Sequence, residues 1–65
     1  MAAHAYFDKL LARDQAAAVV GQYGGAFLRK KGSKSVYRIN GGGEAMIEPA
    51  DGKLRVRFYA GTCPC

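Results

Sequence analysis

The stretch GGAFLRKKGSKSVYRIN at residues 24–40 decides the fold, because the spacing of apolar residues changes there. Before it, apolar residues recur at helical spacing. After it, they alternate with polar residues, as in a strand with one buried face. Two glycines mark the change, and glycine readily ends a helix in the left-handed conformation. The sequence therefore predicts one N-terminal helix followed by strands.

The helix is predicted over residues 3–21, which contain no proline and many alanines. One apolar stripe runs along it, formed by Phe7, Leu10, Leu11, Ala17 and Ala18. Asp14 falls within this stripe, where a buried carboxylate would need a partner. Two alternatives stay open: a continuous helix with Asp14 near the stripe margin, which we prefer, or a break at Arg13 with Asp14 capping a second turn.

Four strands are predicted after the glycines, at residues 26–30, 35–40, 44–48 and 53–60. Turns are predicted at residues 31–34, 40–43 and 49–52, the last opened by Pro49. Short turns join antiparallel neighbours. The expected fold class is thus α+β, with one N-terminal helix packed on a three- or four-stranded antiparallel meander. Residues 1–65 form a single small domain, of which residues 61–65 are a tail.

Strand alternation assigns the two faces of the sheet. The face toward the helix is expected to carry Leu28, Tyr37, Ile39, Ala45, Ile47, Leu54, Val56 and Phe58. The open face is expected to carry Phe27, Arg29, Val36, Arg38, Glu44, Met46, Glu48, Arg55, Arg57 and Tyr59. Glu44 and Glu48 are expected to pair across strands with Arg38, Arg55 or Arg57.

Positive charge is concentrated in the second part of the chain. Ten Lys and Arg residues oppose five Asp and Glu residues, for a net charge of +5, and residues 1–25 contribute none of the surplus. Five cations cluster around one predicted turn: Arg29, Lys30, Lys31, Lys34 and Arg38. Such a cluster favours an acidic partner, either nucleic acid or an acidic protein surface. The alternative is a charged surface that serves solubility alone.

The sequence lacks the residues that a catalytic or metal-binding site requires. His4 is the only histidine, and Glu44 and Glu48 are explained as well by cross-strand pairs. The glycines at 41–43 lack the Lys-Ser/Thr of a phosphate loop. We expect no catalytic residue, no metal and no cofactor.

The end of the chain, Cys63-Pro64-Cys65, offers only one pair of zinc ligands. A disulfide between cysteines two residues apart would be strained, so free thiols in an inert tail are expected. A metal or disulfide contact between two chains and a redox role are the alternatives. Nothing resembles a leader or a membrane span, so no membrane partner and a cytoplasmic location are expected.

The residues around the basic turn also carry a family resemblance. GAFLRKKGSK at residues 25–34, then Val36-Tyr37-Arg38 and the glycine turn, resembles the small HicA-type toxins over roughly residues 10–52. The resemblance implies a fold like the double-stranded-RNA-binding domain and a role in RNA cleavage. However, Lys34 stands where that family has its catalytic His, and residues 53–60 read as a strand instead of the family's closing helix. The resemblance therefore implies an RNA-binding shape without the cleavage chemistry.

Together these features predict a small basic non-catalytic binding module that contacts RNA or DNA through the Lys/Arg-rich hairpin. Phe27, Tyr37 or Tyr59 would pack on or stack with bases. The alternative is an inhibitor or adaptor of the kind that phages and mobile elements encode, similar to anti-CRISPR proteins. Its contact surface would comprise Phe27, Met46, Arg55, Arg57 and Tyr59. A homodimer through a sheet edge or through Val19 and Val20 is also possible.

Overall fold

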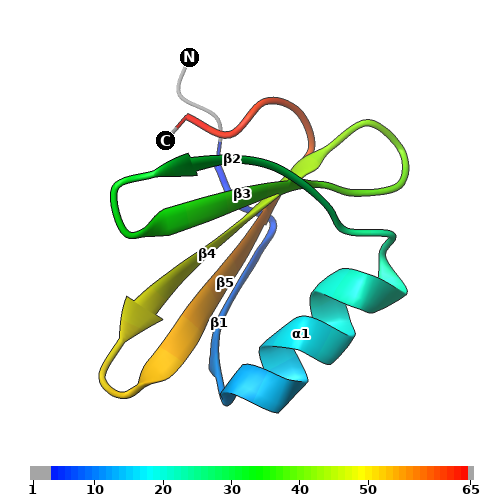
Figure 1. Cartoon of the computed structure of the whole chain (residues 1–65). Helices are drawn as coiled ribbons and strands as arrows, with labels where there is room; N and C mark the ends of the chain where they lie inside the picture. Colours follow the sequence, from blue (N-terminus) through cyan, green and yellow to red (C-terminus); the bar gives the residue numbers. More distant parts are fainter. Residues whose placement is uncertain (1–3, 65) are drawn as a thin grey trace.

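The computed structural model describes residues 4–64 and is an α+β domain with one helix and five antiparallel strands (Figure 1). The elements follow the order β1 (Phe7–Leu11), α1 (Arg13–Gln22), β2 (Ala26–Lys31), β3 (Lys34–Arg38), β4 (Glu44–Ala50) and β5 (Lys53–Tyr59). The strands form one sheet in the order β1-β5-β4-β3-β2. The predicted class is confirmed, but the sheet has five strands where three or four were predicted.

The fifth strand, β1, comes from a segment predicted to be helical. Phe7–Leu11 pairs with β5 along its whole length, from Phe7 opposite Phe58 to Leu11 opposite Leu54. β5 would otherwise present an unpaired edge, and β1 satisfies its backbone groups. Phe7, Leu10 and Leu11 match a helical spacing, but Phe7 and Leu11 also share one face of a strand and pack on the core there.

The helix α1 therefore starts at Arg13, later than the preferred prediction. Its first residue matches the alternative of a break at Arg13, but Ala12 occupies the cap position, not Asp14. The backbone N–H of Ala12 donates to Gln15 Oε1 at 3.4 Å, and Asp14 is exposed in the first turn. At the other end, Gly25 N–H donates to the Val20 carbonyl at 2.9 Å, which turns the chain into β2.

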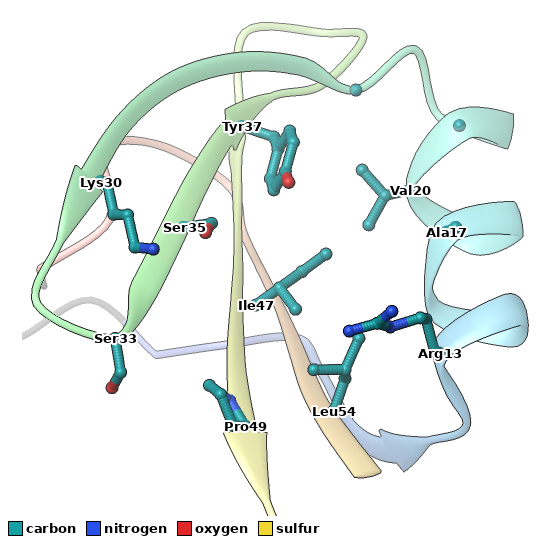
Figure 2. A pocket seen from close by; sticks show the side chains of 12 residues that line it. Arg13, Ala17, Val20, Lys30, Ser33, Ser35, Tyr37, Ile47, Pro49 and Leu54 are labelled. Carbon is teal, nitrogen blue, oxygen red and sulfur yellow. The ribbon is translucent and has the colours of Figure 1, made fainter.

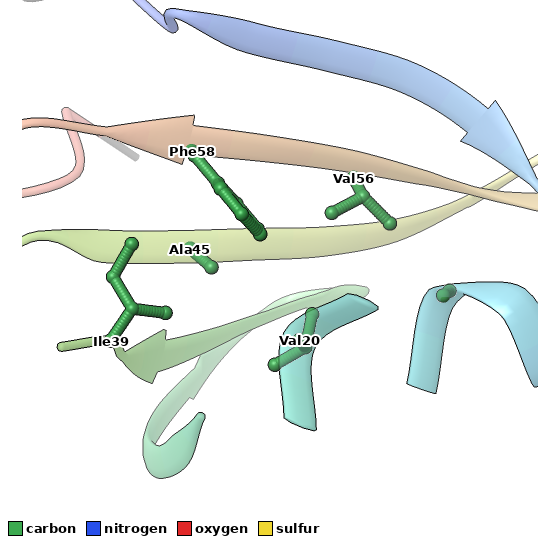
Figure 3. Close-up of a cluster of buried hydrophobic side chains, with 6 residues drawn as sticks. Val20, Ile39, Ala45, Val56 and Phe58 are labelled. Carbon is green, nitrogen blue, oxygen red and sulfur yellow. The ribbon is translucent and has the colours of Figure 1, made fainter. Parts of the chain in front are cut away.

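The main core lies between α1 and the sheet. Ala16 and Val20 of the helix are buried with Ile39, which follows β3, and with three sheet residues, Ala45, Val56 and Phe58 (Figure 3). Phe58 is the largest of these, and its ring stacks on Phe7 at a centroid distance of 4.9 Å and meets Tyr23 edge-on at 5.1 Å. Val19 packs against the same cluster, so the Val19/Val20 surface covers the sheet and is not a free dimer surface.

Two tight turns hold the strands in register. Gly32 and Ser33 join β2 to β3, with a φ of 64° at Gly32, and Asp51 and Gly52 join β4 to β5 with φ values of 50° and 74°. Positive φ at both central residues is the hairpin geometry that favours Asp-Gly. Pro49 was predicted to open this second turn but lies inside β4. The strand tolerates it because the pairing of β4 with β3 extends only to Ile47.

A β-bulge in β2 changes the predicted face of two residues. The register with β3 shifts between Phe27 and Arg29, so Leu28 is the extra residue. Phe27 consequently lies opposite Tyr37 on the helix side, and the two rings meet edge-on at 5.6 Å. Both assignments from simple alternation are wrong here: Phe27 is not on the open face, and Leu28 is exposed outside the core.

The sheet face opposite the helix is partly covered, not open. Val36, Met46, Tyr59 and Cys63 are all buried there and form a second small core, with Ala5 packed against it. Cys63 belongs to the segment predicted to be an inert tail, so that prediction is wrong at this residue. The tail folds back because these apolar strand positions would otherwise face water.

Candidate functional site

The predicted cation cluster lies on the β2–β3 hairpin. We use "basic hairpin" for Lys30, Lys31, Lys34 and Arg38. Lys31 lies opposite Lys34, and Arg38 shares their face, away from the helix. Lys30 lies opposite Ser35 on the helix side. The hairpin thus presents positive charge on both of its faces.

Arg29, the fifth residue of the predicted cluster, is neutralised. Its Nη2 lies 3.0 Å from Glu44 Oε1, so the arginine on β2 reaches across β3 to an acid on β4. The sequence predicted Arg38, Arg55 or Arg57 as the partner of Glu44, and not Arg29. Arg38 does lie opposite Glu44 in register, but the ion pair forms with Arg29.

Glu44 is a buried acid with two partners. Its Oε1 also accepts a hydrogen bond from the backbone N–H of Cys63 at 3.0 Å. This backbone hydrogen bond holds the pKa of Glu44 below its ordinary value of 4.5, against the opposing effect of burial, and Arg29 adds to the decrease. Glu44 and Arg29 therefore form a structural unit that ties the tail to the sheet.

Arg55 and Arg57 share one acidic partner that the sequence did not suggest. Asp8 on β1 contacts Arg55 Nε at 3.2 Å through one carboxylate oxygen and Arg57 Nε at 3.1 Å through the other. Asp8 was expected in a helix, so its position beside β5 was missed. Glu48 lies opposite Arg55, yet no ion pair joins Glu48 to Arg38, Arg55 or Arg57, as had been expected.

These contacts divide the cations that the sequence proposed for binding into two groups. Arg29, Arg55 and Arg57 have acidic partners within 4.0 Å, whereas Lys30, Lys34 and Arg38 have none among residues 4–64. Lys30, Lys31 and Arg38 are exposed, and Lys34 is half-buried. On β2 and β3, the cations without an ion pair to residues 4–64 are thus Lys30, Lys34 and Arg38, and all three belong to the basic hairpin.

The aromatic residues proposed for base stacking differ in how far their side chains are exposed to solvent. Tyr59 is buried in the second core and is not available at the surface. Tyr37 is half-buried on the helix side, where it packs against Phe27. Only Phe27, at 59% exposure, offers a largely open ring beside the hairpin. Met46 is buried as well, so it and Tyr59 do not form the expected protein contact with Arg55 and Arg57.

Other chemistry is sparse in the part of the chain that the structure describes. Within residues 4–64, no three His, Cys, Asp or Glu side chains gather as metal ligands. Cys63 is disulfide-bonded, so the expectation of a free thiol is wrong at this position, and Cys65 lies outside the described residues. His4 borders a shallow hollow with Asp8 and Arg57.

The ten-residue helix α1 is not long and apolar enough to cross a bilayer, and it is the one helix among residues 4–64.

Comparison with known proteins found no matching family model, no matching curated protein and no matching solved structure. The resemblance to the HicA-type toxins therefore stays a hypothesis that rests on residues 25–38 and the glycine turn.

Proposed function

We propose that this protein is a non-catalytic nucleic-acid-binding module that contacts phosphates through the basic hairpin. The observation that carries the proposal is the division of the cations. Arg29, Arg55 and Arg57 contact acidic side chains, while Lys30, Lys34 and Arg38 have no such partner among the described residues. Cations without acidic partners are the groups that exchange counterions for phosphates.

The shape of the hairpin supports the same function. Lys30 extends from one face of this hairpin, which forms one edge of the sheet, and Lys34 and Arg38 extend from the other face. Because β2 is an edge strand, cations on both faces of the hairpin can meet the phosphates of a nucleic acid that lies along this edge. Phe27 lies on β2 on the same side of the sheet as Lys30 and adds an exposed ring for stacking.

The experiment compares binding of short RNA and DNA oligonucleotides, single- and double-stranded, by fluorescence anisotropy over a salt series. In the test variant, Lys30, Lys34 and Arg38 are changed to Gln. We expect a loss of affinity of more than about tenfold, and a salt slope reduced by about 2–3 because about one counterion is released per phosphate contact. Arg29 is left unchanged because it holds Glu44.

The matched control changes Lys9, Lys53 and Arg55 to Gln, which removes the same net charge away from the basic hairpin. We expect this control to bind within a few-fold of the unmodified protein. Equal losses in both variants would mean that net charge alone drives binding. If no oligonucleotide binds with a salt-dependent affinity, the proposal is wrong, and an acidic protein surface becomes the leading partner for the same cations.

A further inference from the structure

A half-open groove lies between α1 and the β2–β3 hairpin (Figure 2). It exists because α1 packs mainly against β5 at one side of the sheet, while β3 and β2 lie at the other side. The space between them has a volume of about 460 Å³. Sites for small organic molecules typically have volumes of about 300–1,000 Å³, so this groove is large enough for such a ligand.

The lining of the groove is largely apolar. Val20 and Ala17 come from the helix side, and Tyr37, Ile47 and Leu54 come from three strands of the sheet. In Figure 2 these side chains face one another across the space. A lining of this kind, in which Tyr37 is the one aromatic side chain, suits a hydrocarbon body, whereas nucleic-acid bases stack on flat rings.

Two cations border the apolar lining from opposite sides. Arg13 extends from the first turn of α1 toward Ile47 and Leu54, and Lys30 points inward from β2 beside Ser35 (Figure 2). Neither forms an ion pair with any residue of 4–64. None of the five acidic residues of the chain lines the groove. The groove is therefore complementary to a negative charge attached to an apolar body.

We propose that this groove binds a small amphiphilic organic anion. Arg13 and Lys30 attract the carboxylate of the ligand from the borders of the groove, and its apolar body lies against Val20, Ile47 and Tyr37. This site is separate from the phosphate contacts of Lys34 and Arg38, which extend from the opposite face of the hairpin. Lys30 is the one residue that both proposals use.

The test is a titration of the full chain with decanoate, followed by amide chemical shifts and by calorimetry. We expect saturable binding at one site, with the largest shifts at the groove residues. Arg13→Gln and Lys30→Gln should each weaken binding by about tenfold, because each removes a charged partner of the carboxylate. Decanol and decyltrimethylammonium share the hydrocarbon body without the negative charge and should bind much more weakly.

A steric variant tests the position of the ligand. Ala17 is exposed and lines the groove, whereas Ala18 is exposed on the same helix and does not line it. Ala17→Trp should abolish decanoate binding, and Ala18→Trp should leave it unchanged. Ala17→Leu provides a smaller block if the tryptophan variant does not fold. Unchanged binding in the folded Ala17 variant, or equal binding of decanol and decanoate, would overturn the proposal.

Different variants test the groove that binds decanoate and the hairpin that binds oligonucleotides. Ala17→Trp and Arg13→Gln should abolish or weaken decanoate binding while leaving oligonucleotide binding intact. Arg38→Gln should weaken oligonucleotide binding while leaving decanoate binding intact. If Arg13→Gln and Arg38→Gln each weaken both ligands to the same degree, there are not two sites, and the separate anion site is wrong.

Discussion

Glu44 Oε1 accepts the backbone N–H of Cys63 at 3.0 Å and at the same atom contacts Arg29. One carboxylate thus connects β4, the end of the chain and the edge strand β2. It also removes Arg29 from the cations that could meet a partner. The contact therefore determines both how the tail is held and which residues carry the proposed binding.

The tail should contribute to stability. Deletion of residues 63–65 removes the N–H donor to Glu44 and uncovers Val36, Met46 and Tyr59. Glu44 keeps Arg29 but loses its backbone donor, and a lost hydrogen bond to a charged group costs about 1.5–3 kcal/mol, so we expect a fall in Tm of at least about 4 °C in thermal unfolding followed by circular dichroism. A double change of Cys63 and Cys65 to Ala keeps the N–H donor and should cost less. A truncated chain that melts with the unmodified protein would contradict this.

Stability should depend on pH through Glu44. Its pKa is lowered in the folded state, so its charged form stabilises the fold above the ordinary value of 4.5, and this stabilisation is lost as the pH falls through the lowered folded pKa. Chemical unfolding at several pH values should show a steeper loss of stability below pH 4.5 for the unmodified protein than for Glu44→Gln. Parallel curves for the two proteins would show that Glu44 does not carry this dependence.

Asp8 should matter little for stability. Its contacts with Arg55 and Arg57 are largely exposed, and exposed ion pairs contribute less than about 1 kcal/mol. We therefore expect Asp8→Asn to lower the free energy of unfolding by no more than that amount in urea titration. The same change frees two arginines and should raise affinity for an anionic oligonucleotide. A loss of several kcal/mol would mean that Asp8 holds β1 on β5.

Gly25 should resist substitution, because a side chain there has no room. A Cβ at Gly25 would meet the side chain and the carbonyl of Val20, whereas a Cβ at Gly21 meets nothing within 4 Å. Gly25→Ala should destabilise by more than about 1 kcal/mol. Gly21→Ala, within the helix, should stabilise by about 0.5–1 kcal/mol. Urea unfolding of both variants checks the pair, and an equal effect at both positions would contradict the close approach.

The sequence by itself determined the second part of the fold. Period-two alternation located β3 to β5 to within a few residues, and the two-residue sequences Gly32-Ser33 and Asp51-Gly52 lie at the tips of predicted turns. These signals are local, because side-chain alternation and positive φ depend on neighbouring residues alone. The cluster of cations on β2 and β3 was likewise visible, since a hairpin brings residues close in sequence together in space.

Only the tertiary structure decided the remainder. Residues 7–11 are compatible with a helix or a strand, and they form a strand because their backbone pairs with the otherwise unpaired edge of β5. The bulge at Leu28 reverses the side on which Phe27 lies. The pairing of charged side chains also depended on long-range packing. Asp8 contacts Arg57, which is 49 residues away in the chain. Glu44 forms its ion pair with Arg29, although Arg38 lies directly opposite it in the sheet. Sequence spacing cannot specify such pairs, because folding places these side chains together only after the strands have paired.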